Sequence, residues 1–359
     1  MPEGNNINVL QSLDTWVSES EQMLAALVVL EQLVPVTGEG TVFFPPTFAT
    51  PRGERQSSGY NIDENDNTSI CLVDSVGSQA NRMENAFMRP PLDDLVPQIV
   101  VNAGENHVNL LAAGHRIADA IVRFSELRPI VDERLAAYRQ GNAVPLARLA
   151  PTSLLFGAWD SRETNIKIPR LIESVIRAFG VRKLTRSAQY TPAIDYRELG
   201  FSEEELSKDA ASAMGLAHVP STGTPGGVIA QEGIKRQTVL NLTALRNLAG
   251  GTHEESITLR RYMLGLALSA LAVRDHNLRQ GCLLTAVPGK PCQAELVYYD
   301  GRRENVEIGE LFIRKYATAA AEEFGVDAGQ VIEFKTDSLK KSLKDASAKN
   351  KKARGDGGD

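Results

Sequence analysis

Strand-like and helix-like apolar runs follow one another irregularly along this chain, and that order limits the folds it can adopt. Strand-like runs stand at 70–75 and 98–103, and a strand followed by a helix is expected over 234–248. Helical patterns occupy 78–88 and 107–124, and a further helix is expected over 8–33. Because strands and helices are mixed without regular β-α alternation, the pattern predicts an α+β fold.

Three other segments add to this outline. An apolar stripe follows Pro169 at helical spacing and ends at Gly180, which predicts a helix over 169–179. The apolar run 262–273 is too short to span a bilayer and predicts a core helix. Asp300-Gly301 separates two strand-like runs, as in a hairpin. Since no internal repeat or clean linker divides the chain, we expect a single elaborated domain over 1–345.

Charge is distributed unevenly along the chain, whose formal net charge is -6. Residues 335–359 hold eight basic and four acidic side chains, so the rest of the chain is more acidic than the total. Low apolar content predicts a disordered basic tail over 346–359, either a solvated tail or a weak nonspecific nucleic-acid contact. Within the acidic body, six basic residues against one acid between 167 and 190 are therefore a local feature.

The chain lacks the sequence patterns of common catalytic and metal-binding sites. Its three cysteines form no C-x-x-C pair, and its five histidines are scattered. H-E-x-x-H, G-x-S-x-G, G-x-G-x-x-G and the P-loop spacing do not occur. The first residues show no basic segment ahead of an apolar stretch. We therefore expect a cytoplasmic, non-enzymatic protein with no catalytic residues, no metal site and no cofactor.

Polar and basic side chains suited to a phosphate backbone occur in three places. Gln79, Asn81 and Arg82 begin the helix expected after strand 70–75, where amide and guanidinium donors can bind phosphate oxygens. The cluster from Lys167 to Arg186 is the second place. Lys235-Arg236 is the third, and it follows a glycine-rich loop that we expect to be mobile. Neutralising phosphates releases condensed counterions, which favours binding.

Each of the three places also has an ordinary structural interpretation. Arg82 alone is typical of a surface salt bridge, and Lys235-Arg236 of a solvated strand edge. The cations after residue 180 would also be favourable near the C-terminus of a helix. That placement accounts for one or two of these cations but not for all of them.

Three ordered blocks carry a family resemblance: "ICLVDSVGSQANRMENAF" (70–87), "PTSLLFGAWDSRETNIKIPRLIESVIRAFGVRKLTRSAQYTPAIDY" (151–196) and "GTPGGVIAQEGIKRQTVLNLTALRNL" (223–248). They resemble the RAMP-superfamily backbone subunit of the type I-G CRISPR effector complex, formerly called type I-U. The resemblance covers roughly residues 30 to 285. It implies a modified RNA-recognition-motif (ferredoxin-like) palm with inserted finger and thumb elements, the thumb lying around 198–234.

The resemblance also implies a function and a set of partners. Copies of the subunit would stack along a CRISPR guide RNA in a Cascade surveillance complex and present it for pairing with target DNA in antiviral defence. The partners would be the guide RNA, target DNA through the guide, further copies of the chain and other Cascade subunits, without a membrane. The residues expected to hold the guide are Ser78, Gln79, Asn81, Arg82, Lys167, Arg170, Arg182, Lys183, Arg186, Gln189, Lys235 and Arg236.

We expect RNA binding to be independent of the RNA sequence, because contacts to the phosphate backbone carry no information about the bases. The aromatic signature with which a standard RNA-recognition motif stacks bases on its sheet is not visible. One alternative is a RAMP-type endoribonuclease acting on guide or target RNA, with Asp160 in "GAWDSRE" as the candidate, although an aspartate in such a loop is typically a turn or cap residue. Another is an interaction protein whose basic patch meets an acidic partner.

Overall fold

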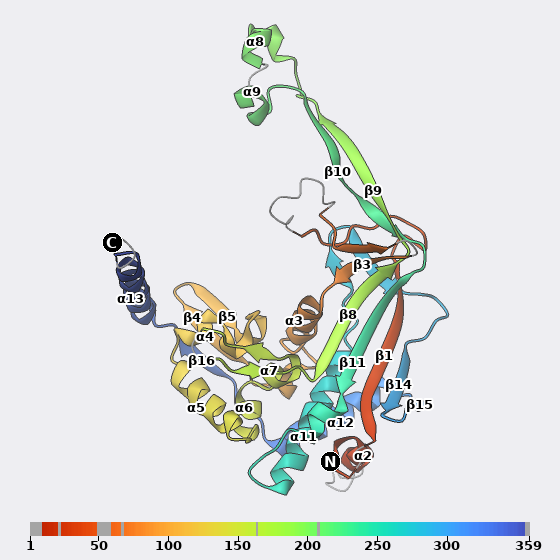
Figure 1. The fold of residues 1–359 in the computed structure, drawn as a ribbon, viewed down its shortest axis with the longest axis vertical. Coiled ribbons are helices and arrows are strands. Elements are labelled where there is room, and N and C mark those ends of the chain that lie inside the picture. The colour runs from red at the N-terminus through yellow and green to blue at the C-terminus, as the bar shows by residue number, and fades with distance from the viewer. Residues whose placement is uncertain are drawn as a thin grey trace.

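A strongly curved antiparallel sheet lies at the centre of the protein, shown in Figure 1 as a computed structural model that describes residues 9–20, 23–48, 59–65, 68–162, 164–206 and 209–355. The strand order is β12-β13-β1-β11-β8-β3-β2, and β14 also pairs with β1 and carries β15 at its other edge. The bounds are β12 Asn277–Arg279, β13 Cys282–Ala286, β1 Leu24–Pro35, β11 Ile234–Asn241, β8 Ile172–Phe179, β3 Thr68–Asp74, β2 Ile62–Asn65, β14 Gln293–Tyr298 and β15 Arg303–Asn305.

The central strands divide their side chains between a covered and an open face. Along β11 buried residues alternate with more exposed ones, as expected for a strand with one covered face. Lys235 lies opposite Arg177 of β8, and Val239 lies opposite Glu173. Since directly opposed side chains share a face, these charges lie on the open side, and Arg236 lies on the covered side.

Helices α3 (Val76–Ala86) and α11 (His253–Leu271) pack on the covered face of the sheet. The main core joins Leu27, Ile172 and Leu240 of the sheet to residues of both helices. A third helix, α12 (Glu310–Phe324), packs closely on α11, where a Cβ on Gly265 would come within 2.9 Å of the Ala317 Cα. The fold is thus α+β, as predicted, and a sheet covered by helices on one face is compatible with an RNA-recognition-motif-like palm.

A long two-stranded ribbon, here called the arm, continues β8 and β11 away from the body (Figure 1). It consists of β9 (Val181–Tyr190) and β10 (Val219–Ala230). The tip carries a 3-10 turn (Tyr196–Leu199) and the short helices α8 (Glu203–Leu206) and α9 (Asp209–Ala213). The segment 198–234, predicted as the thumb, thus includes part of the tip and all of β10, whereas β9 lies upstream of it.

The arm is attached where β10 meets the body. Phe43 pairs with Val228, and a Cβ on the preceding Gly227 would lie 2.9 Å from the Phe43 carbonyl oxygen. Gly227 also has a φ of +95°, so glycine suits this position in both conformation and space. The glycine-rich segment 221–227, expected to be a mobile loop, is instead part of β10 and pairs with β9.

Short helices and small sheets form the rest of the body. β4 (Ile99–Ala103) pairs in parallel with β16 (Gln330–Glu333) and in antiparallel with β5 (Asn106–Asn109). Strands β6 (Ala158–Trp159) and β7 (Lys167–Ile168) form a short ribbon that follows helix α7 (Pro151–Phe156). The remaining helices are α2 (Asp14–Val17), α4 (Ala120–Arg123), α5 (Arg128–Arg139), α6 (Val144–Leu149), α10 (Leu242–Arg246) and α13 (Thr336–Gly355) and 3-10 turns at Asp93–Leu95, Leu110–Ala112 and Arg116–Ala118.

Several local predictions are confirmed. Strand 70–75 and the helix after it correspond to β3 and α3, and strand 98–103 to β4. The strand and helix over 234–248 correspond to β11 and α10, and the core helix 262–273 to most of α11. β14 and β15 form the predicted hairpin around Gly301, which has a φ of +88°.

Other local predictions are wrong. The described residues of segment 8–33 form α2 and most of β1, because the apolar run pairs along β11 and β14. Segment 169–179 is not a helix but contains the central strand β8. Segment 107–124 is broken into β5, two 3-10 turns and α4, and Arg116 within it has a φ of +54°, which no α-helix accommodates.

The basic end of the chain contains one further helix, and the disorder expected over 346–359 stays a prediction. α13 continues to Gly355, through most of the tail expected to be disordered from 346, and 356–359 lie outside the described residues. Within the described part of the chain, no helix is both long enough and apolar enough to cross a membrane. The division into a single domain over 1–345 with a thumb at 198–234 stays a prediction.

Candidate nucleic-acid interface

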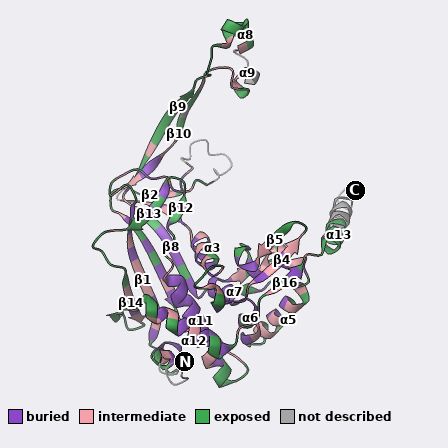
Figure 2. Ribbon diagram, turned by 180° about the vertical axis from the view of Figure 1, so that it is seen from behind, coloured by how far each residue is buried: buried purple, intermediate pink, exposed green. Residues whose placement is uncertain are grey.

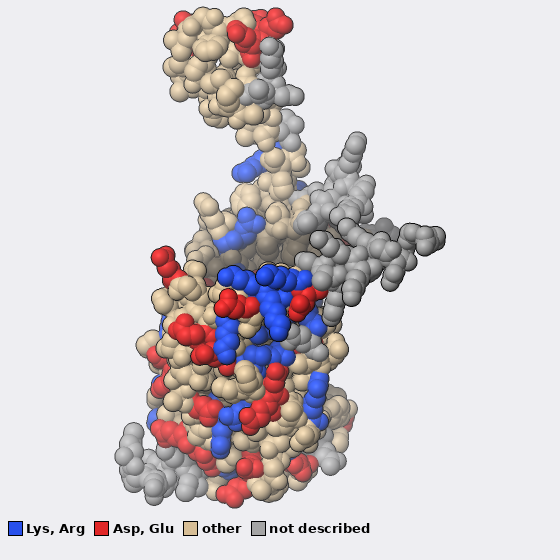
Figure 3. All heavy atoms as spheres, turned by 90° about the vertical axis from the view of Figure 1, so that its left-hand side faces the viewer, with Lys and Arg blue, Asp and Glu red and all other residues tan. Residues whose placement is uncertain are grey.

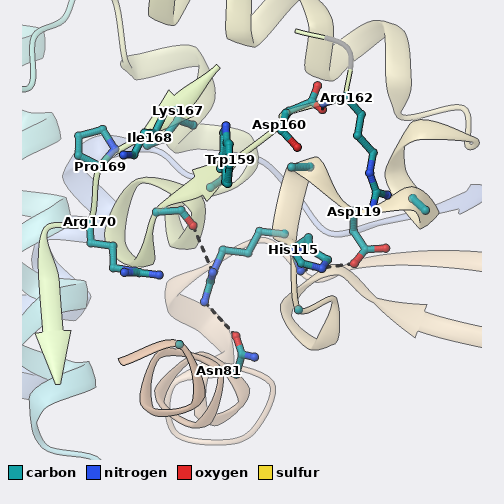
Figure 4. A pocket seen from close by; sticks show the side chains of 18 of the residues that line it. Asn81, His115, Asp119, Trp159, Asp160, Arg162, Lys167, Ile168, Pro169 and Arg170 are labelled. Atoms are coloured by element: carbon teal, nitrogen blue, oxygen red, sulfur yellow. Dashed lines mark hydrogen bonds between the residues drawn. The ribbon is translucent and has the colours of Figure 1, made fainter. Parts of the chain in front are cut away.

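An open cleft of about 790 Å³ lies between α3, the segment 114–123, the β6–β7 ribbon and the chain entering β8. Figure 4 shows side chains from these separate segments around one opening. We call it the basic cleft, because five cations line it against three carboxylates. The cations are Arg116, Arg123, Arg162, Lys167 and Arg170, and the carboxylates are Asp119, Asp160 and Glu173.

The floor of the basic cleft is built on Arg116. Its Nη1 donates to the Gly157 carbonyl oxygen at 3.1 Å, and its Nη2 donates to Asn81 Oδ1 at 3.2 Å. Its Nε lies 2.8 Å from Glu84 Oε2, and both side chains are buried. Burial raises the pKa of the Glu84 carboxyl to about 7, because the loss of solvation outweighs the attraction of Arg116. Arg116 therefore ties α3 to the segment before β6.

The rim of the basic cleft presents Lys167 and Arg170, two of the predicted RNA-binding residues, as exposed side chains. The Arg170 Nε donates to the Phe156 carbonyl oxygen at 3.1 Å. Gly157 makes room for this side chain, since a Cβ there would lie 2.8 Å from the Arg170 Cγ. Gly157 has φ +80° and ψ 154°, a conformation essentially restricted to glycine. The position of Arg170 therefore depends on this glycine.

Asp160 is the turn residue of the β6–β7 ribbon. Its carboxylate accepts hydrogen bonds from the backbone N–H of Arg162 (3.1 Å) and of Thr164 (3.0 Å), and from the Thr164 hydroxyl (2.8 Å). Arg123 also lies 3.5 Å from it. Asp160 is buried, and its contacts hold the loop, which agrees with the turn interpretation of this aspartate.

Helix α3 brings only one of its four predicted residues into the basic cleft, namely Asn81. Gln79 is 2% exposed and bonds to Asp74 and Ser174. Arg82 donates to Asp74 and to the backbone oxygens of residues 277 and 278. The backbone N–H of Ser78 is capped by Ser75. The geometry does not support phosphate contacts by Gln79 and Arg82, because their polar groups are engaged within the fold.

Lys235 and Arg236 point to opposite faces of the sheet. Arg236 is 3% exposed, donates to Ser174 Oγ (3.2 Å) and to the Val273 carbonyl oxygen (2.9 Å), and lies 3.5 Å from Glu31. Arg236 is thus packed in the core, and its predicted role as a phosphate ligand stays a prediction. Lys235 is exposed on the open face, with its Nζ 5.2 Å from the centre of the Phe179 ring.

The remaining four predicted residues lie on β9 in the arm, and all are exposed (Figure 2). Because side chains alternate along a strand, Arg182 and Arg186 share one face, and Lys183 and Gln189 share the other. Lys183 Nζ is paired with Glu64 Oε1 at 2.9 Å. Figure 3 shows basic side chains gathered on the upper part of the body below the arm and acidic side chains at its tip.

The basic cleft contains cations that sequence reasoning missed. Arg116 and Arg123 lie in a segment predicted as a helix, and nothing local marked them as neighbours of Lys167. Arg162 lies in the quoted "GAWDSRE" loop, so its place in the second block was the one available signal. The roles of the twelve predicted residues in RNA binding stay predictions.

Residues 27–183 match the family described as CRISPR-associated protein GSU0053. No curated protein matches the chain. The matched range runs from β1 into β9 and includes every residue that lines the basic cleft. The match confirms the resemblance seen in the sequence at the level of a CRISPR-associated family. The part of the chain that builds the basic cleft thus matches the CRISPR-associated protein GSU0053 family, and this match supports a role in CRISPR defence.

Proposed function

We propose that this protein is a non-catalytic backbone subunit that binds CRISPR guide RNA and oligomerises along it in a cytoplasmic type I Cascade complex. The subunit presents the guide for pairing with target DNA. The observation that carries the proposal is the basic cleft, where Lys167 and Arg170 stand exposed beside a third exposed cation, Arg162. Cations arranged along an open cleft suit a phosphate backbone, and such contacts are independent of sequence.

The arm supplies a second surface for the same guide. Arg182 and Arg186 stand on one exposed face of β9, and β8 separates them from the basic cleft. Eight strand residues span roughly 25 Å, so one guide phosphate cannot serve both surfaces. A guide that touches both must run along the subunit, as a backbone role requires. The arm then acts as the thumb of a single elaborated domain and reaches toward the next copy.

The contacts of Asp160 favour a scaffold over a ribonuclease. A carboxylate that acts as a general base must reach the proton that it removes. Asp160 is buried, and both of its oxygens accept hydrogen bonds from its own loop. We therefore expect Asp160→Asn to leave guide RNA uncut and the bound complex unchanged, apart from a less stable loop.

Co-expression with a CRISPR guide transcript tests the proposal. The purified protein is separated by size exclusion, and the extracted RNA is sized before and after ribonuclease treatment. A large particle with protected RNA of guide length is the expected result. A particle that contains RNA only as shortened cleavage products would favour the ribonuclease instead. A protein that stays free of RNA even when the other subunits of its complex are co-expressed would contradict the proposal.

A further inference from the structure

Trp159, at the rim of the basic cleft, is a large aromatic side chain left 66% exposed. The other tryptophan of the chain, Trp16, is 5% exposed in the core. Removing a flat apolar ring from water is favourable. Aromatic side chains with one edge exposed to solvent are common where ligands bind. The position of Trp159 in this cleft therefore suggests a ligand with a flat face.

The β6–β7 ribbon sets the direction in which Trp159 points. Trp159 lies directly opposite Lys167, and Ala158 lies opposite Ile168. Opposed residues share a face, so Trp159 and Lys167 project together, while the buried Ile168 anchors the other face in the core. Asp160 fixes the adjoining turn through the bonds described above. An aromatic ring and a cation are thus held side by side on a rigid support.

The surroundings of Trp159 are polar and mainly cationic. Figure 4 shows its ring standing between the Lys167–Pro169 segment and the Asp160 loop, with Arg170 and His115 lining the same opening. Among the carboxylates, Asp160 holds its turn, and Asp119 accepts the backbone N–H of Ile121 at 3.1 Å. A partner that offers a flat apolar face and negative charge at short intervals matches this arrangement, and single-stranded nucleic acid has both.

We propose that Trp159 stacks on a nucleobase of single-stranded RNA in the basic cleft, while Lys167 contacts an adjoining phosphate. The inference rests on the proposed function and adds to it a base contact outside the sheet. Stacking on an aromatic ring accepts every base and contributes about 1–3 kcal/mol. It therefore holds a base without reading it, which suits a subunit that must accept any guide.

The test compares the full-length protein with Trp159→Ala and Trp159→Phe by fluorescence anisotropy of two end-labelled probes. One probe is oligouridylate RNA, and the other is a ribose-phosphate chain of equal length without bases. On oligouridylate, Trp159→Ala should bind about tenfold more weakly, as the stacking energy implies, and Trp159→Phe should keep most of the affinity. On the abasic chain, all three proteins should bind alike. Thermal melts of the variants check the fold.

A second readout follows the ring directly. In a Trp16→Phe background Trp159 is the sole tryptophan, and stacking should quench its fluorescence with oligouridylate but not with the abasic chain. Equal binding of oligouridylate by the native and Trp159→Ala proteins, without quenching, would overturn the stacking and leave the proposed function standing. Equal losses on both probes would assign Trp159 a structural role and would also overturn it. If the native protein bound neither probe, even together with the other subunits of its complex, the proposed function would fall, and the stacking with it.

Discussion

The basic cleft and the arm both contain cations of the basic stretch 167–190, yet the two are held in place very differently. The cleft rests on the main core, with Arg116 and Glu84 buried beneath it. The arm is a two-stranded ribbon whose residues are largely exposed, as Figure 2 shows, and it is attached at its base near Phe43. A site on a packed body keeps its geometry without a ligand, whereas an isolated ribbon gains order from what it binds.

The separation of the two surfaces depends on β8. As a strand it spans roughly 25 Å between the cleft and the arm, whereas a helix of the same length would span about 12 Å. The helix expected over 169–179 would have kept the cations close together. The strand instead divides them into a rigid set at Lys167 and Arg170 and an exposed set on β9.

The largest effect on stability is expected from a substitution that removes the buried support of the basic cleft and leaves the arm unchanged. Arg116→Ala leaves the Glu84 carboxylate buried without its cation and should lower the free energy of unfolding by about 3–5 kcal/mol above pH 7, where Glu84 is ionised in the native protein. Urea unfolding monitored by circular dichroism measures the loss. The control Arg302→Ala, on an exposed hairpin, should change stability by less than about 0.5 kcal/mol. Equal small losses in both variants would show that the cleft does not depend on this ion pair.

Glu84 also makes the body sensitive to pH. Burial raises its pKa from 4.5 to about 7, so between these values the folded state binds more protons than the unfolded state. The free energy of unfolding should therefore fall as pH rises through this window, by at most about 1.4 kcal/mol per pH unit from this group, and then level off. Glu84→Gln should reduce the fall in urea midpoints between pH 5 and 7. If Glu84→Gln left the pH dependence of the urea midpoint unchanged, other titratable groups would be its cause.

Charge reversal in the cleft should weaken RNA binding more than reversal in the arm. Lys167→Glu with Arg170→Glu removes two charge-assisted phosphate contacts, so the affinity for single-stranded RNA should fall on the order of 100-fold. The control Arg89→Glu with Lys315→Glu makes the same change in net charge at exposed residues outside the cleft. Anisotropy titrations at fixed salt measure both. If control and cleft variants lost affinity equally, only net charge would matter.

Charge reversal in the arm should reduce the affinity for a short RNA less than charge reversal in the basic cleft. Arg182→Glu with Arg186→Glu alters one face of β9 and should weaken binding about tenfold, because the ribbon must be ordered when it binds. Lys183→Glu should do less than either of these changes alone, since this lysine already pairs with Glu64 on the other face. A larger loss from the arm pair than from the cleft pair would reverse the ranking of the two surfaces.

Sequence patterns predicted the fold well where one face of an element is covered. α3 carries such a pattern and the β14–β15 hairpin carries a turn signal, and both were found. α11 was found from a continuous apolar run, since its residues 262–271 are all buried. β1 and β8 are paired on both sides in the centre of the sheet, and their many apolar residues hide the two-residue period. In 169–179, buried residues happened to fall at helical spacing. Short apolar runs of this kind are ambiguous without the partners that cover them.

The candidate site was predictable only where its residues are close in sequence. Lys167 and Arg170 were found because they belong to a local concentration of charge. Arg116 joins them through the packing of a distant segment, and no local pattern marks such a neighbour. The burial of Arg236 was missed for the same reason, since its partner Glu31 on β1 lies far away in the sequence. Burial of a charge next to a distant partner is a property of the fold.

Ultraviolet crosslinking of the protein to guide RNA, with mass spectrometry of the crosslinked peptides, tests most directly whether one guide touches both surfaces. We predict crosslinks at 159–170 in the basic cleft and at 182–189 in the arm within the same particle. We expect none at the exposed controls Arg89 and Lys315. Crosslinks confined to other parts of the chain would contradict guide binding at both surfaces, and crosslinks in the cleft alone would remove the arm from the RNA-binding surface.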